Sequence, residues 1–168
     1  LRRIEKEDAA AAGHPLEGAI RRANRAERLA GHLFEQVLES ETVRTLVMNV
    51  GTEGSDGRGQ FLALRLAELA MGAYGLNTAV QRALKLAASR GTEGVTILIA
   101  QAFAHQEFRR LLGEAEDLAA MIASVDAERG AQAGHFTRQM RENAPFDLSH
   151  ALDEIAGHFL TVERYDLD

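Results

Sequence analysis

Three side chains that could bind a metal ion recur at helical spacing near the end of the chain. His150, Glu154 and His158 are each four residues apart, so they would form one line along a helix. Imidazole and carboxylate groups hold metals in helical bundles when they project into the bundle interior. At roughly 100° per residue, however, this line falls on the side away from the segment's apolar residues. We therefore expect the trio to face solvent, as a weak metal candidate only, and we expect no cofactor.

A glycine-rich stretch, VGTEGSDGRGQ at residues 50–60, has the composition of a loop that binds phosphate at the start of a helix. It lacks the Gly-Lys-Ser/Thr of a P-loop, and no predicted strand precedes it. Glu53 and Asp56 would also repel a phosphate. We predict a connector between two helices that acts as a hinge, with a lid or a partner contact as alternatives. The hinge residues are Gly51, Gly54, Gly57, Arg58 and Gly59.

A basic ridge lies on the first predicted helix, on the side opposite its expected apolar seam. Such a ridge can follow the phosphates of a nucleic acid, and it can equally dock an acidic protein surface. The chain carries a net charge of −6, which favours a protein partner or self-association over nucleic acid. An ordinary solvated face is the third interpretation. The ridge residues are Arg21, Arg25, Arg28 and His32, and Arg22 lies nearby as a further candidate.

Arg65 and Glu68 are the only charged residues in the apolar segment 60–74, and their spacing places them on one side of a helix. Charges on a buried helix need partners, so we predict an internal polar pair. Beside a cavity, this pair would suit a ligand-binding or enzymatic bundle with the 51–59 loop as its lid. The sequence favours a non-enzymatic protein, because its serines lie in no nucleophile motif and it has no cysteine. No catalytic residue is predicted.

The elements that must position these groups are predicted to be helices. Three segments place apolar residues alternately three and four apart, the spacing of a seam that faces a partner helix. The first seam is Leu16, Ile20, Ala23, Glu27, Ala30, Phe34 and Val37, with Glu27 as its charged exception. The second is Phe108, Leu111, Ala115, Leu118, Ile122 and Val125, and the third is Leu148, Leu152, Ile155, Phe159 and Val162. Three such seams predict an all-α helical bundle.

The bundle is expected to contain six or seven helices, of which the longest spans about 93–128. Residues 60–74 are apolar almost all round, which predicts a central, buried helix. Separate helices are expected over 77–89, around 133–142 and over 147–163. The segment ETVRTLVMNV, residues 41–50, contains β-branched residues, but its apolar positions recur at i, i+3, i+4 and i+7 and favour a helix.

The length of 168 residues suits one helical domain over 15–168, preceded by a flexible segment over 1–14. No apolar segment is long enough to span a bilayer, so we expect a cytoplasmic protein without a membrane partner. The chain begins at Leu1 instead of Met, and whether it is a piece of a longer protein is left open by the sequence. We expect an interaction or assembly module that associates through its seams, as a homo-oligomer or with another protein. A nucleic-acid-associated helical domain is the alternative.

Overall fold

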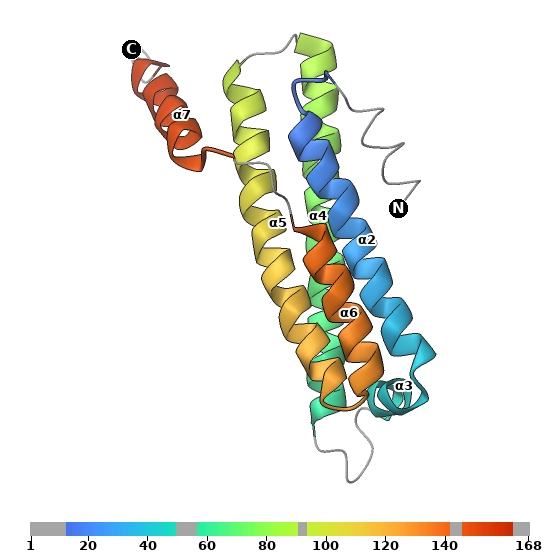
Figure 1. Cartoon of the computed structure of the whole chain (residues 1–168). Helices are drawn as coiled ribbons and strands as arrows, with labels where there is room; N and C mark the ends of the chain where they lie inside the picture. Colours follow the sequence, from blue (N-terminus) through green and yellow to red (C-terminus); the bar gives the residue numbers. More distant parts are fainter. Residues whose placement is uncertain (1–12, 50–56, 91–93, 142–145, 163–168) are drawn as a thin grey trace.

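The computed structural model describes residues 13–49, 57–90, 94–141 and 146–162, and this part of the chain contains six helices and no strand (Figure 1). The helices are α2 (Glu17–Glu39), α3 (Glu41–Met48), α4 (Arg58–Arg90), α5 (Gly94–Ala123), α6 (Ala127–Met140) and α7 (Leu148–Val162). The predicted all-α bundle is therefore confirmed. Of the segment 1–14, which was expected to be flexible, residues 1–12 lie outside the described residues.

The bundle is built on the pair of α2 and α5. These two helices contact each other, and each of them also contacts both α4 and α6. Figure 1 shows α4 behind this pair and α6 in front of it, over its lower half. In cross-section, α2 and α5 thus form the short diagonal of a rhombus, with α4 and α6 at the two outer corners. A corner helix packs on one side only, which decides what α4 exposes.

The core seam of α2 differs from the predicted one at its alternate positions. Its buried residues recur three and four apart: Leu16, Ala19, Ala23, Ala26, Ala30, Leu33 and Val37. Ala19, Ala26 and Leu33 replace Ile20, Glu27 and Phe34 of the prediction, and Glu27 is exposed. Alanine side chains let α2 approach its neighbours closely, so the seam follows the alanines rather than the bulkier residues beside them. The apparent charged exception in the seam disappears with this correction.

Two helix boundaries also differ from the prediction. The segments 60–74 and 77–89 belong to one continuous helix, α4, because Gly75 between them stays helical. The long helix α5 ends at Ala123 instead of near residue 128. It ends there because Asp126 begins α6: its carboxylate accepts a hydrogen bond from the backbone N–H of Arg129, at 3.1 Å. The second predicted seam is confirmed as far as Ile122, since Phe108, Leu111, Ala115, Leu118 and Ile122 are all buried. Its last member, Val125, lies beyond the end of α5 and is half-buried.

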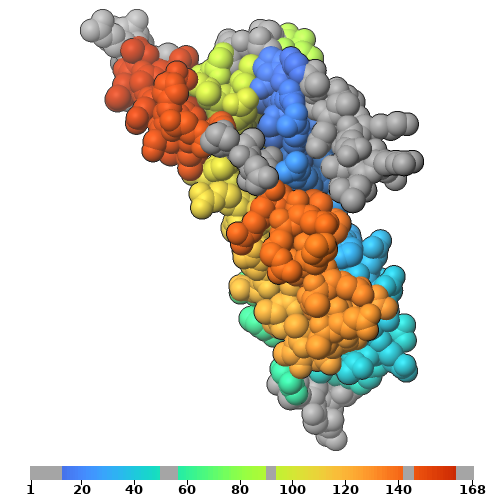
Figure 2. Space-filling model, viewed as in Figure 1, coloured from blue at the N-terminus to red at the C-terminus, as the bar shows by residue number. Residues whose placement is uncertain are grey.

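The third predicted seam, on α7, is only partly buried. α7 packs against α5 and projects beyond the outline of the bundle (Figure 2). Ala151 is buried, whereas Leu152 is 45% exposed and Phe159 is 52% exposed. α6 already occupies the fourth position of the bundle, so α7 packs mainly on α5 among the described helices. No helix in the described part of the chain has both the length and the apolar character that crossing a membrane requires.

The corner between α2 and α3 is joined to the corner between α5 and α6 by two capping residues. Ser40 caps α3, where its hydroxyl accepts from the backbone N–H of Val43 at 3.3 Å. The same hydroxyl donates to the carboxylate of Asp126, which caps α6, at 2.7 Å. An ion pair between Glu39 and Arg129 lies alongside. These contacts fix the two corners at one end of the bundle.

Candidate interaction surface

The outer side of α4 carries an exposed apolar seam. Leu64, Met71 and Tyr74 are 52%, 64% and 73% exposed. Ala67 and Thr78 are also exposed and continue the alternation of three and four residues. We call these five residues the outer seam: Leu64, Ala67, Met71, Tyr74 and Thr78. At 1.5 Å per residue the outer seam is about 21 Å long.

The outer seam is uncharged throughout its length. From Gln60 to Gln81, a stretch that the structure describes completely, the only charged residues are Arg65 and Glu68, which are partly exposed and pair with each other beside the seam. The first exposed charges beyond it are Arg82 and Lys85. A helix surface that only meets water usually carries charged residues, whereas this one has the composition of a surface that packs against protein.

The opposite side of α4 explains why the segment appears apolar all round. Its buried residues form a second seam with the same alternation: Leu62, Leu66, Leu69, Ala73, Leu76, Val80 and Ala83. A Cβ atom at Gly72 would lie 2.6 Å from Leu111 Cδ2, so α4 approaches α5 closely at this point. The expectation of a central, buried helix is wrong. α4 is a corner helix with one seam in the core and one outside.

The pair of Arg65 and Glu68 forms as predicted, but at the surface. The guanidinium of Arg65 donates to the Glu68 carboxylate at 3.2 Å, and the two side chains are 33% and 38% exposed. The guanidinium of Arg65 also lies over the ring of Phe61, 5.3 Å from its centroid. The prediction of an internal pair is therefore wrong, because it rested on a buried α4. The pair flanks the outer seam instead.

The basic ridge is largely engaged within the molecule. Arg22 is buried, and its guanidinium lies 5.3 Å from the ring centroid of Phe146. Arg21 is paired with Glu17, one turn earlier on α2. Arg25 and Arg28 are half-buried, and each has an interaction partner. Arg22, which lies beside the predicted ridge and not on it, shares its face with buried Leu29 and Gln36 at intervals of seven residues.

His32, the last member of the ridge, is an interhelix contact. Its ring stacks on Phe136 of α6, with 4.0 Å between the ring centroids. Burial lowers the pKa of His32 below its ordinary value of 6.5, and the charge of Glu35 only partly opposes this shift. The ring is therefore mainly neutral at pH 7 and adds little positive charge to the ridge.

Part of the predicted hinge can be placed. Gly51 and Gly54 lie outside the described residues, whereas Gly57 directly precedes α4, and Arg58 and Gly59 are its first two residues. Gly57 has a φ of +75°, a left-handed conformation that suits glycine. Gly59 is buried, and a Cβ atom there would collide with the carbonyl oxygen of Leu46 in α3. Gly59 thus fits a tight joint between α3 and α4.

The candidate metal trio lies on the exposed side of α7, as its angular position predicted. His150 and Glu154 are 3.4 Å apart, with side chains that are 68% and 48% exposed. The ring of His158 contacts Phe159 edge to face. In the part of the chain that the structure describes, no group of three or more His, Asp or Glu side chains is arranged to hold a metal ion.

The outer seam of α4 was missed at the sequence level, although its spacing was visible. An alternation of three and four residues occurs on two sides of the same helix, so the segment resembles a helix that is buried all round. Comparison with known proteins gives no further guide, because no family model, no curated protein and no solved structure matches the chain.

Proposed function

We propose that this protein is a helical assembly module in which two copies pair through the outer seams of α4. The observation that carries the proposal is the exposed, uncharged seam from Leu64 to Thr78. The core seams of α2 and α5 are already used inside one chain. The outer seam has the same spacing and lacks a partner within the described bundle. Two such seams packed against each other would remove their apolar side chains from water.

A second copy fits this surface because α4 is complementary to itself. Gly75 is exposed, and Glu68 and Arg82 lie seven residues before and after it. In an antiparallel pair with a two-fold axis at Gly75, Glu68 of each copy would face Arg82 of the partner subunit. Leu64 would likewise face the partner's Leu86, which is 37% exposed. A Cβ atom at Gly75 would meet nothing within 4 Å, so the helices can approach closely at the axis.

The size of the seam sets the expected strength of the association. A contact about 21 Å long on one helix lies at the low end of the area range of specific interfaces. The pairing should therefore be reversible and depend on concentration. A fixed dimer at all concentrations is not expected.

The proposal is tested by measuring mass against concentration. Light scattering and analytical ultracentrifugation should show a monomer that becomes a dimer at high micromolar concentration. Replacing Met71 and Tyr74 together by Glu should keep the protein monomeric, because two carboxylates would enter the seam of each copy. Both side chains are exposed, so circular dichroism should show an unchanged fold.

Two controls separate this seam from other surfaces. Leu152→Glu places the same charge on an exposed apolar residue of α7 and should leave the dimer intact. The charge reversals Glu68→Arg and Arg82→Glu should each weaken the dimer, and combining them should restore it. The proposal is wrong if the wild-type protein stays monomeric at high concentration, or if Leu152→Glu disrupts the association and the α4 variant does not.

A further inference from the structure

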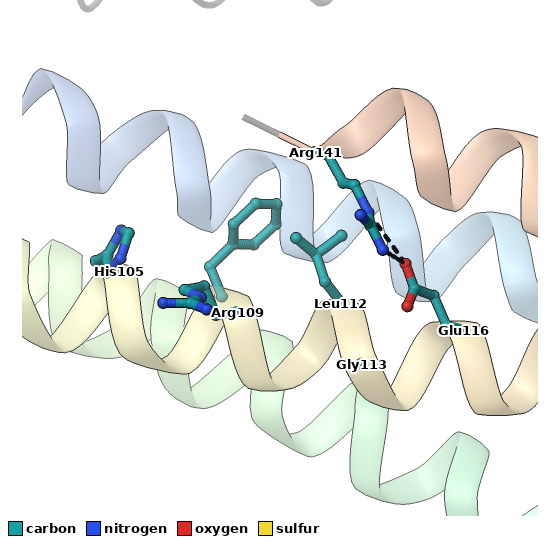
Figure 3. Close-up of a pocket in the computed structure, with 7 residues that line it drawn as sticks. His105, Arg109, Leu112, Gly113, Glu116 and Arg141 are labelled. Atoms are coloured by element: carbon teal, nitrogen blue, oxygen red, sulfur yellow. Dashed lines mark hydrogen bonds and ion pairs between the residues drawn. The ribbon is translucent and has the colours of Figure 1, made fainter. Parts of the chain in front are cut away.

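A groove lies along α5 where α6 stops covering it. α6 ends at Met140, and Arg141 leaves the helix with φ −58° and ψ 134°. The groove that results has a volume of about 390 Å³, within the usual range of pockets for small molecules. Figure 3 shows its side chains projecting from successive turns of α5, with Arg141 reaching over from the end of α6.

The inner part of the groove is apolar. Phe108 is buried and forms the floor, and half-buried Leu112 lies one turn further along α5. At Gly113 an added Cβ atom would meet nothing within 4 Å, so no side chain fills this part of the groove. His105 lines the other end, and its ring lies against Phe146, with 5.0 Å between the centroids.

The outer part of the groove carries an excess of positive charge. The guanidinium of Arg141 is compensated by Glu116, with 3.1 Å between Nε and Oε1. Arg109 is exposed and forms no hydrogen bond or ion pair within the part of the chain that the structure describes. Among the described residues, the Arg109 guanidinium at the groove therefore has no partner for its donors. This is a local positive site in a chain whose net charge is −6.

We infer that this groove binds a small organic anion, a carboxylate attached to a flat apolar body. The planar guanidinium of Arg109 can donate two parallel hydrogen bonds to one carboxylate. The apolar body would then lie over Phe108 and Leu112, beside the ring of His105. Neither half suffices alone, because a single exposed ion pair is weak and the apolar floor is small. This site is on α5, away from the outer seam of α4, so it does not depend on the proposed dimer.

The inference is tested with two probes that share a naphthalene ring and carry either a charged or a neutral polar group. Naphthalene-2-carboxylate and neutral naphthalene-2-methanol are titrated into the full chain, and binding is followed by amide chemical shifts. The carboxylate should bind at least about tenfold more tightly, and the shifts should centre on α5 between His105 and Glu116. Arg109→Gln should reduce carboxylate binding to the level of the alcohol, because the charge-assisted bonds are lost.

A second variant tests the cavity without changing any charge. Gly113→Leu should block both probes, and leucine is a better helix former than glycine, so the variant should remain folded. Matched controls are Arg82→Gln, an exposed arginine on α4, and Gly157→Leu, an exposed helical glycine on α7, and both should bind like the wild type. Equal affinity for the two probes, or wild-type binding by Arg109→Gln or by Gly113→Leu, would overturn the inference.

Discussion

At the scale of single residues, the hydroxyl of Ser40 stabilises the charged form of the Asp126 carboxylate. The hydrogen bond from Ser40 lowers the pKa of Asp126 below its ordinary value, and the backbone N–H of Arg129 acts in the same direction. Because the pKa is lower in the folded state, the folded chain binds fewer protons than the unfolded chain in the acid range. This stabilising effect is complete above the unfolded pKa of about 3.9 and is lost as the pH falls through the folded pKa.

Replacing Ser40 by Ala should therefore change two quantities. The free energy of unfolding at pH 7 should fall by about 1 kcal/mol from the loss of the α3 cap alone. The pKa of Asp126 should rise towards its ordinary value, as measured by carboxyl chemical shifts. Ser89→Ala is the control, because the hydroxyl of Ser89 bonds only to the carbonyl of Leu86 in its own helix. An unchanged pKa for Asp126 would show that Ser40 does not hold its charged form.

His32 predicts a second dependence on pH. Its pKa is lowered by burial, so the unfolded chain takes up a proton at a higher pH than the folded chain. Stability should fall as the pH drops below about 6.5, since protonation then favours the unfolded state. In His32→Phe, the loss of unfolding free energy between pH 7 and pH 5 should be smaller than in the wild type. His150→Phe, at an exposed position, should not reduce that loss; identical curves for wild type and His32→Phe would contradict the prediction.

Arg22 shows what could not be predicted for single residues. Its residue type and its position on the first helix grouped it with the arginines of the basic ridge. Its guanidinium lies near the ring of Phe146, which comes from the segment before α7. Helical periodicity identifies only neighbours on the same helix. A contact with a segment that is distant in the sequence therefore cannot be predicted from it.

At the scale of elements, α4 shows how far helical periodicity leads. The spacing predicted helices over nearly all the segments that form them, and it correctly identified the core seam of α5. It could not tell which seam of α4 faces the core, because both seams follow the same alternation. The choice is made by packing: the inner seam has four leucines and Val80, whereas Thr78 interrupts the outer one.

This asymmetry predicts that two leucines on one helix contribute very unequally to the free energy of unfolding. Leu69→Ala should lower the free energy of unfolding by about 2–5 kcal/mol, because it removes a fully buried side chain from the core. Leu64→Ala should change it by no more than about 0.5 kcal/mol at concentrations where the protein is monomeric. Urea unfolding of both variants measures the difference. Similar losses for the two would mean that Leu64 is buried in the free monomer.

At the scale of the whole molecule, α7 stands apart from the bundle. Its amphipathic pattern indicated that one side would be covered, and α5 covers only part of that side, around Ala151. The pattern of one helix cannot show how many neighbours it will have. The number of neighbours of α7 depends on α6 (Ala127–Met140), which already fills the fourth position over half the length of the bundle (Figure 1).

Removing α7 should accordingly leave the bundle folded. A chain that ends at Asp147 keeps Phe146, and with it the ring that contacts Arg22 and His105. Thermal unfolding followed by circular dichroism should stay cooperative, with a midpoint close to that of the full chain, because α7 contributes one buried side chain among its described residues. The shortened chain should also still associate, since the outer seam of α4 is untouched. Loss of cooperative unfolding would mean that α7 belongs to the folding unit. Loss of association alone would indicate that the copies associate through α7 and not through α4.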